Sequence, residues 1–195
     1  MTKMQHSGVG LFSFMITQPE IADPLFSATS SLPCRRETRF AASEHFLTER
    51  PSARGVRFSE FGPNFREHFL TRVEQDVPAA HVHAHRLRRS SSDQEIGARL
   101  GKGREIRLCH LFRVLERQPN GETDGLACVA NRATVCYIRA ADGRLWTVRA
   151  LWSVFRGFEG VNLDDPSIRQ GWYLEAALSD GPHAFWGLGG HVLSL

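Results

Sequence analysis

The chain has 195 residues, of which 42% are hydrophobic and 23% are charged. These proportions are ordinary for a globular protein, and the length allows one domain to bury a sizeable core. The net charge of +3 is small and evenly divided between the two halves, which argues against a dedicated nucleic-acid-binding protein. No apolar run approaches the roughly 20 residues that a membrane-spanning helix needs.

Arginine replaces lysine almost throughout the chain. Only Lys3 and Lys102 are lysine among the 24 basic residues, so 22 are arginine. Arginine forms planar, two-pronged contacts with carboxylates and phosphates. A GC-rich genome explains the bias more simply, because arginine codons are rich in G and C. We therefore expect a protein from a GC-rich bacterium, or from a virus or mobile element that lives in one.

The four cysteines, Cys34, Cys109, Cys128 and Cys136, lack the spacing of a metal site. The last three lie among apolar residues, which is typical of buried, reduced thiols. The apolar run at residues 8–16 is short for a secretory signal, and no small-residue cleavage site follows it. We expect a cytoplasmic protein of a bacterial host that does not interact with membranes.

Apolar patterns in the first half predict short strands and helices in alternation. Residues 9–17 are typical of a buried strand and residues 55–61 of a short one. A helix is expected over residues 37–50, where Pro51 ends it. A second helix is expected over residues 63–75, because apolar side chains recur there at helical spacing.

The second half is dominated by apolar runs that predict an antiparallel meander. Residues 104–117 fit a strand or a helix, and a strand is favoured because a turn and another apolar run follow. The turn around Asp142-Gly143 is expected to join strands at residues 133–139 and 145–152 in a hairpin. A second hairpin is expected between residues 172–178 and 184–193.

Between these halves, Ser92 and Glu95 have the spacing of a capping box that begins a helix ending near Leu100. Together the elements predict an α+β fold, with short helices in the mixed portion at residues 1–103 and mainly antiparallel sheet at residues 104–195. No linker separates the two portions, so residues 1–195 are expected to form a single domain.

The most distinctive stretch is residues 80–89, with the sequence AHVHAHRLRR. In a strand, His81, His83 and His85 share one face because successive side chains alternate. Neighbours two residues apart lie roughly 6.5–7 Å from each other, so two imidazoles can converge on zinc or another divalent metal. Candidates for a further ligand are Glu74, Asp76, His110, His183 and His191.

An ordinary polar strand face is the simpler interpretation of the histidines. Arg86, Arg88 and Arg89 would repel a divalent cation, and no other element of a zinc motif accompanies them. The same alternation describes a half-exposed edge strand. A metal-dependent hydrolase that uses His81, His83 and His85 is therefore an alternative function, and otherwise no cofactor is expected.

No catalytic motif of any specificity occurs in the sequence, such as a Gly-x-Ser-x-Gly nucleophile elbow. The leading expectation is a non-enzymatic protein-binding module that acts by steric occlusion. A plausible setting is a phage or mobile-element inhibitor of a bacterial defence complex, such as an anti-CRISPR protein.

The expected interface lies in the C-terminal sheet, because tryptophan and arginine dominate binding hot spots. Its residues are Arg132, Arg139, Arg144, Trp146, Arg149, Trp152 and Arg156. Aromatic and arginine side chains on a sheet can also stack bases and hold phosphates. Nucleic-acid binding is therefore a further alternative.

Overall fold

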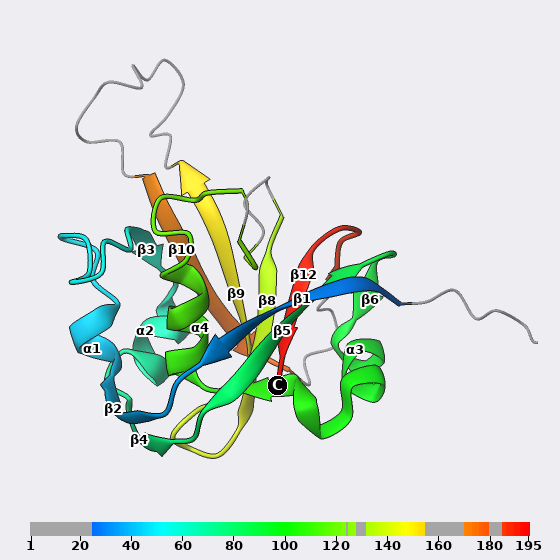
Figure 1. Ribbon diagram of the computed structural model, residues 1–195, viewed down its shortest axis with the longest axis horizontal. Helices are drawn as coiled ribbons and strands as arrows, with labels where there is room; N and C mark the ends of the chain where they lie inside the picture. Colours follow the sequence, from blue (N-terminus) through cyan, green and yellow to red (C-terminus); the bar gives the residue numbers. More distant parts are fainter. Residues whose placement is uncertain (1–24, 124, 128–131, 155–169, 180–184) are drawn as a thin grey trace, which may run out of the picture.

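A computed structural model of the chain describes residues 25–123, 125–127, 132–154, 170–179 and 185–195 (Figure 1). The predicted strand at residues 9–17 lies outside them. Helices and strands follow one another in this order: β1 (Phe26–Cys34), β2 (Glu37–Ala41), α1 (Ala42–His45), β3 (Phe58–Phe61), α2 (Pro63–Phe69), β4 (Val73–Val77), β5 (Ala80–Leu87), β6 (Ser91–Ser92), α3 (Asp93–Leu100), a 3₁₀ turn (Gly101–Arg104), β7 (Glu105–Ile106), α4 (Leu108–Leu115), β8 (Thr134–Arg139), β9 (Leu145–Val154), β10 (Gln170–Leu178), β11 (Phe185–Trp186) and β12 (His191–Ser194).

An eight-stranded mixed sheet forms the centre of the molecule. Seven of its strands run in the order β1-β5-β12-β8-β9-β10-β3, and β7 also pairs with β8. As predicted, β8, β9 and β10 are successive antiparallel neighbours. The sheet is mixed because β12 runs parallel to β8, and β3 runs parallel to β10. The fold is therefore a mixed, sheet-dominated α and β structure that is not divided into a helical half and a sheet half.

The two predicted hairpins have different outcomes. The first is confirmed, because β8 and β9 pair across a turn in which Gly143 takes a positive φ of 83°. The second is wrong, because β12 pairs with β5 and β8 and not with β10, while β11 pairs with β6. The final strand lies between two others, with Val192 and Leu193 buried on opposite faces of the sheet.

Alternating side chains give the sheet two apolar faces. On β8, Cys136 and Ile138 belong to the main core, whereas Tyr137 belongs to a smaller apolar cluster with Leu87 and Ile96. Figure 1 shows α1, α2 and α4 grouped on one side of the molecule and α3 on the other. The main core therefore lies beneath α1, α2 and α4, and the smaller cluster lies beneath α3.

Three predicted helix and strand assignments are wrong over part of their length. Residues 37–41 form β2, which pairs with β4, so only residues 42–45 of the expected 37–50 helix are helical. The expected helix at residues 63–75 ends at Phe69, and β4 follows. Within residues 104–117, the expected strand is mainly α4. Hydrogen bonds between distant segments account for the differences. β2 and β4 pair with each other, and Glu74 on β4 accepts hydrogen bonds from the first turn of α4. No helix in the described part of the chain is long and apolar enough to span a membrane.

Helix α4 depends on a buried carboxylate from another element. Glu74, on β4, is only 5% exposed. Its two oxygens accept hydrogen bonds from the backbone N–H groups of Leu108 and Cys109, at 3.0 and 2.9 Å. Arg72 lies 3.5 Å from the same carboxylate. A helix N-terminus attracts negative charge and has N–H groups without partners in the helix, so Glu74 stabilises the first turn of α4.

A second buried carboxylate joins α3 to the other face of the sheet. Asp93 is 4% exposed and lies in the first turn of α3, where the predicted capping box of Ser92 and Glu95 is confirmed. Its oxygens accept hydrogen bonds from Tyr137 Oη and Trp186 Nε1, both at 2.6 Å, and from Thr147 Oγ1 at 2.9 Å. One side chain therefore connects α3 with β8, β9 and β11.

Replacing Glu74 tests how strongly α4 depends on this contact. In a Glu74→Ala variant, two helix N–H groups and Arg72 lose their buried partner. We expect the free energy of unfolding to fall by about 3 kcal/mol, as when one partner of a buried ion pair is removed. Urea denaturation measures this. The matched control is Gln75→Ala, at an exposed position of the same strand, and a Glu74→Ala loss no larger than that of the control would contradict the prediction.

Candidate functional site

A cleft of about 580 Å³ opens between the end of β1, the turn into β2, the loop that carries Arg54, and the last turn of α4. This volume falls within the range of small-ligand sites. We call it the arginine cleft. Its lining consists of Leu32, Pro33, Cys34, Arg35, Arg36, Glu37, Arg54, Arg113, Glu116 and Arg117.

The lining carries an excess of positive charge. Five of the ten residues are arginine and two are glutamate, so the cleft has a formal charge of +3. The whole chain has the same net charge. Positive charge is therefore concentrated in this cleft, and the rest of the chain is balanced. A concave site of one sign raises the local concentration of ions of the opposite sign.

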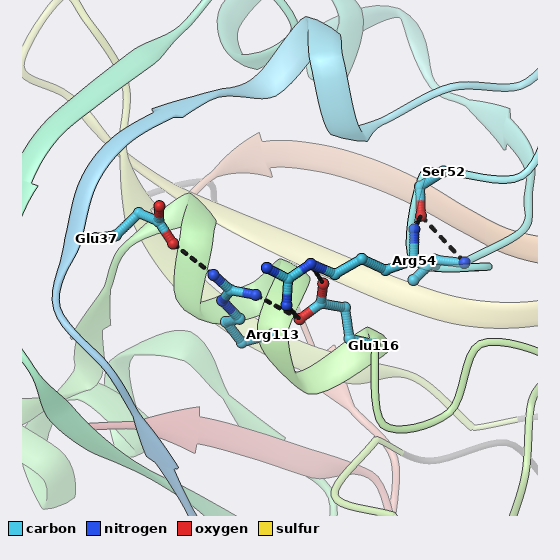
Figure 2. Close-up of polar contacts among 6 residues, drawn as sticks. Glu37, Ser52, Arg54, Arg113 and Glu116 are labelled. Atoms are coloured by element: carbon cyan, nitrogen blue, oxygen red, sulfur yellow. Dashed lines mark hydrogen bonds and ion pairs between the residues drawn. The ribbon is translucent and has the colours of Figure 1, made fainter.

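Two glutamates hold the inner arginines in place, as Figure 2 shows. Arg113 Nη2 lies 2.6 Å from Glu37 Oε2, and Arg113 Nη1 lies 2.9 Å from Glu116 Oε2. Arg54 Nε lies 2.9 Å from the other oxygen of Glu116. Glu116 therefore lies between two guanidinium groups, and Arg113 lies between two carboxylates. The arrangement restrains Arg113 between two carboxylates and orients the more exposed Arg54 toward Glu116.

The C-terminal end of α4 contributes three of the lining residues. Arg113 lies in the last turn of the helix, Glu116 is its C-cap and Arg117 follows, and their spacing of three and four residues brings them to one side of the helix end. The opposite face is apolar, and Leu111, Val114 and Leu115 are buried in the core. Because Glu74 stabilises the start of α4, it also helps to position the charged residues at its end.

A short turn positions Arg54. The hydroxyl oxygen of buried Ser52 accepts hydrogen bonds from the backbone N–H groups of Arg54 and Val56, at 3.3 and 3.1 Å (Figure 2). Gly55 takes a positive φ of 83°, which glycine adopts without strain, and its N–H donates to the Ser52 carbonyl. The backbone that carries Arg54 is therefore hydrogen-bonded within the turn.

The outer arginines retain more of their hydrogen-bonding capacity. Arg35 and Arg117 are exposed and have no ion-pair partner among the residues that the structure describes. Arg36 pairs with Asp76 at 2.9 Å, but both side chains are more than 60% exposed. A pair so exposed to water is weak. Arg35, Arg36 and Arg117 can therefore donate to an anion that enters the cleft.

Cys34 contributes a neutral thiol to the lining. Burial raises its pKa, and Arg113 and Arg117 only partly oppose this effect. The thiol is therefore protonated near neutral pH and is a poor nucleophile. The cleft combines guanidinium groups with apolar atoms of Leu32, Pro33 and Cys34, which we call its apolar floor. Its chemistry is that of an anion-binding site.

The residues of the interface expected from the sequence lie on both faces of β9 and at the β8–β9 hairpin end, and their role in binding stays a prediction. Trp146 is 4% exposed and lies in the core, and Trp152 is half-buried against Trp172. Arg149 lies on the opposite face of β9, over the ring of Tyr173. At the β8–β9 hairpin end, Arg144 pairs with Asp142 and lies over the Trp146 ring at 5.6 Å, and Arg139 pairs with Glu105 and donates to the Gly143 carbonyl. Arg132 is exposed, and Arg156 lies outside the described residues.

The histidine strand is confirmed, but it is not an edge strand. β5 pairs with β1 on one side and β12 on the other. His81, His83 and His85 share the face opposite Val82 and Ala84, which are in the main core. His85 Nε2 lies 2.7 Å from Ser194 Oγ, and the rings of His83 and His85 are 6.3 Å apart. Within the described ranges, no group of three metal-ligating side chains is found, so a metal at this strand stays a prediction.

The sequence pattern did not reveal the arginine cleft. Its arginines come from residues 35–36, 54 and 113–117, and each segment alone is ordinary in composition. The only available signal was the predominance of arginine over lysine, which also has a genomic explanation. Comparison with protein-family models, curated proteins and solved structures finds no match to this chain. The function is therefore inferred from the cleft itself.

Buried histidines predict that mild acid destabilises the fold. Burial lowers the pKa of His45, His85 and His110, and His83 adds to the effect at His85. These groups bind protons more readily when the chain is unfolded, where the pKa is about 6.5. The stability that they contribute is therefore present above about pH 6.5, and it is lost as pH falls through their folded pKa values.

Urea denaturation between pH 7.5 and 5.5 measures this dependence. We expect the midpoint to fall with pH, and a His85→Gln variant to show a smaller fall than the wild type. The exposed His81 on the same strand provides the control, and His81→Gln should keep the wild-type slope. A midpoint that does not change over this range would contradict the expectation.

Proposed function

We propose that the chain is a non-enzymatic binding protein that holds an anionic segment of a partner protein in the arginine cleft. The observation that supports the proposal is the concentration of five arginines around a cleft of about 580 Å³. Arginine clusters are a recurring means of recognising acidic and phosphorylated motifs. Occupation of the cleft would place the partner against the exposed turn between β1 and β2.

The internal ion pairs support a binding role. Arg54 and Arg113 are held by Glu37 and Glu116 before any ligand arrives. Side chains that are already ordered lose less conformational entropy when a partner binds. The exposed Arg35 and Arg117 complete the positive rim without such restraint. The cleft thus has a pre-organised interior and an adaptable rim.

The narrower expectations from the sequence stay predictions. These are a phage inhibitor of a bacterial defence complex, a metal-dependent hydrolase at the histidine strand, and a nucleic-acid-binding protein. Nucleic-acid binding uses the same charge chemistry as the proposal. It differs from the proposal in its steep dependence on salt, because each neutralised phosphate releases condensed counterions.

A charge-reversal variant of the rim tests the proposal. Arg35→Glu combined with Arg117→Glu changes the charge of the cleft by −4 without removing a described ion pair. We expect the affinity for a fluorescein-labelled hexaglutamate peptide, measured by fluorescence anisotropy at 150 mM salt, to fall at least tenfold. Local charge repulsion and the loss of guanidinium donors both weaken the complex.

The control matches the total change in charge. Arg88→Glu combined with Arg99→Glu also alters two exposed arginines, and neither of them lines the cleft. We expect this variant to weaken peptide binding less than twofold. Equal losses for the two variants would show that only net charge matters. A single-stranded oligonucleotide that bound far more tightly than the peptide would favour the nucleic-acid alternative.

A further inference from the structure

We propose that the arginine cleft selects a phosphomonoester, so that the segment it binds carries a phosphorylated side chain. This inference rests on the proposed function, and it adds the chemical class of the group that is bound. It depends on three properties of the cleft: the carboxylates already inside it, the arginines that can still donate hydrogen bonds to a ligand, and the net positive charge of the lining.

The resident carboxylates make the cleft a poor site for another carboxylate. Glu37 and Glu116 already contact Arg54 and Arg113 at 2.6 to 2.9 Å. Both belong to the chain, so their effective concentration at these guanidinium groups is high. An entering carboxylate would offer the same single charge and would lose translational freedom as well. A single carboxylate therefore has little advantage over the groups already present, whereas a peptide with several carboxylates can still pair with the exposed Arg35 and Arg117 at the rim.

A phosphomonoester differs in charge and in the number of its acceptors. It carries about −1.5 to −2 charges near neutral pH and has three oxygens that accept hydrogen bonds. Arg35 and Arg117 have no described ion-pair partner, and Arg36 has only an exposed one. A tetrahedral group can accept from several guanidinium groups at once while Glu37 and Glu116 keep their contacts.

The charge of the cleft favours a monoester over a diester. The lining has a formal charge of +3, or +2 when Asp76 beside Arg36 is counted, and two negative charges bring it close to balance. A backbone phosphate of nucleic acid carries a single charge, and successive phosphates are spread along a chain. The cleft is partly open, and its volume of about 580 Å³ suits one such group better than a series. The inference therefore points to a phosphorylated side chain and not to a nucleic-acid backbone.

The apolar floor gives the ester group a place to lie. Leu32, Pro33 and Cys34 line the cleft beside the arginines. Burial keeps the Cys34 thiol neutral, so it does not repel an anion. The cleft volume of about 580 Å³ leaves room for a side chain behind the phosphoryl group. A ring or an aliphatic stem can contact the floor.

Three small probes that share a phenyl ring separate these possibilities. Phenyl phosphate is a monoester, methyl phenyl phosphate is a diester with one charge, and benzoate is a carboxylate. Titration of the full chain at pH 7.5 and constant ionic strength, followed by ¹H–¹⁵N NMR, gives an affinity for each. We expect phenyl phosphate to bind at least tenfold more tightly than either of the others.

Two further measurements assign this binding to the cleft. Arg35→Gln combined with Arg117→Gln should weaken phenyl phosphate binding about tenfold, and Arg88→Gln combined with Arg99→Gln should leave it within twofold. The affinity should also fall as pH drops below about 6, where the phosphate takes up its second proton.

Each contrary result has a definite meaning. Benzoate or the diester binding as tightly as phenyl phosphate would overturn the inference, and the proposed function would still stand if hexaglutamate bound in the cleft. Equal losses in both double variants would overturn it as well, because the phosphate would then bind to scattered surface charge. Failure of both phenyl phosphate and hexaglutamate to bind would overturn the proposed function too.

Discussion

The buried carboxylate of Glu74 is the contact on which the candidate site depends. It accepts two hydrogen bonds from the first turn of α4 and lies beside Arg72, far from water. An isolated buried charge would be costly, but here the helix N-terminus and a guanidinium group both compensate it. Helix α4 then packs its apolar face on the core and presents Arg113, Glu116 and Arg117 at its other end.

A buried carboxylate fixes the start of a helix on each face of the sheet. Glu74 on β4 accepts from the first turn of α4, and Asp93 at the start of α3 accepts hydrogen bonds from three side chains of the sheet region. Each buried acid joins the beginning of a helix to strands distant in sequence. The hydrophobic contacts of the core do not depend on direction, whereas these hydrogen bonds do, so they fix how each helix is placed.

Local sequence patterns predicted those elements whose neighbours are close in the chain. The β8–β9 hairpin and the capped start of α3 follow from Asp142-Gly143 and from Ser92 with Glu95, and the structure confirms both. Residues 37–41 and 104–117 were assigned wrongly because their patterns fit two states. Strand β4 determines both structures: its pairing with β2 makes residues 37–41 a strand, and its Glu74 side chain stabilises the start of α4. Such long-range contacts leave no periodic signal.

The candidate site was harder to predict than the fold for the same reason. The histidine stretch stood out because its residues are adjacent, and its strand and shared face are confirmed. The arginines of the cleft come from three separate segments, and only the fold brings Arg35, Arg54 and Arg117 together. Of the tryptophans expected at an interface, Trp146 lies in the main core and Trp152 packs against it, because the sheet face beneath α1, α2 and α4 is filled by large apolar side chains.

A crystal structure of the chain with phenyl phosphate bound tests the central claim most directly. The account predicts the phosphoryl group inside the arginine cleft, within hydrogen-bonding distance of Arg117 and of at least one of Arg35, Arg36 and Arg54. It also predicts that Glu37 and Glu116 keep their contacts with Arg113, and that the ring lies within the cleft beside these side chains. Phenyl phosphate bound at the histidine strand or at a different arginine, with the cleft empty, would contradict the account.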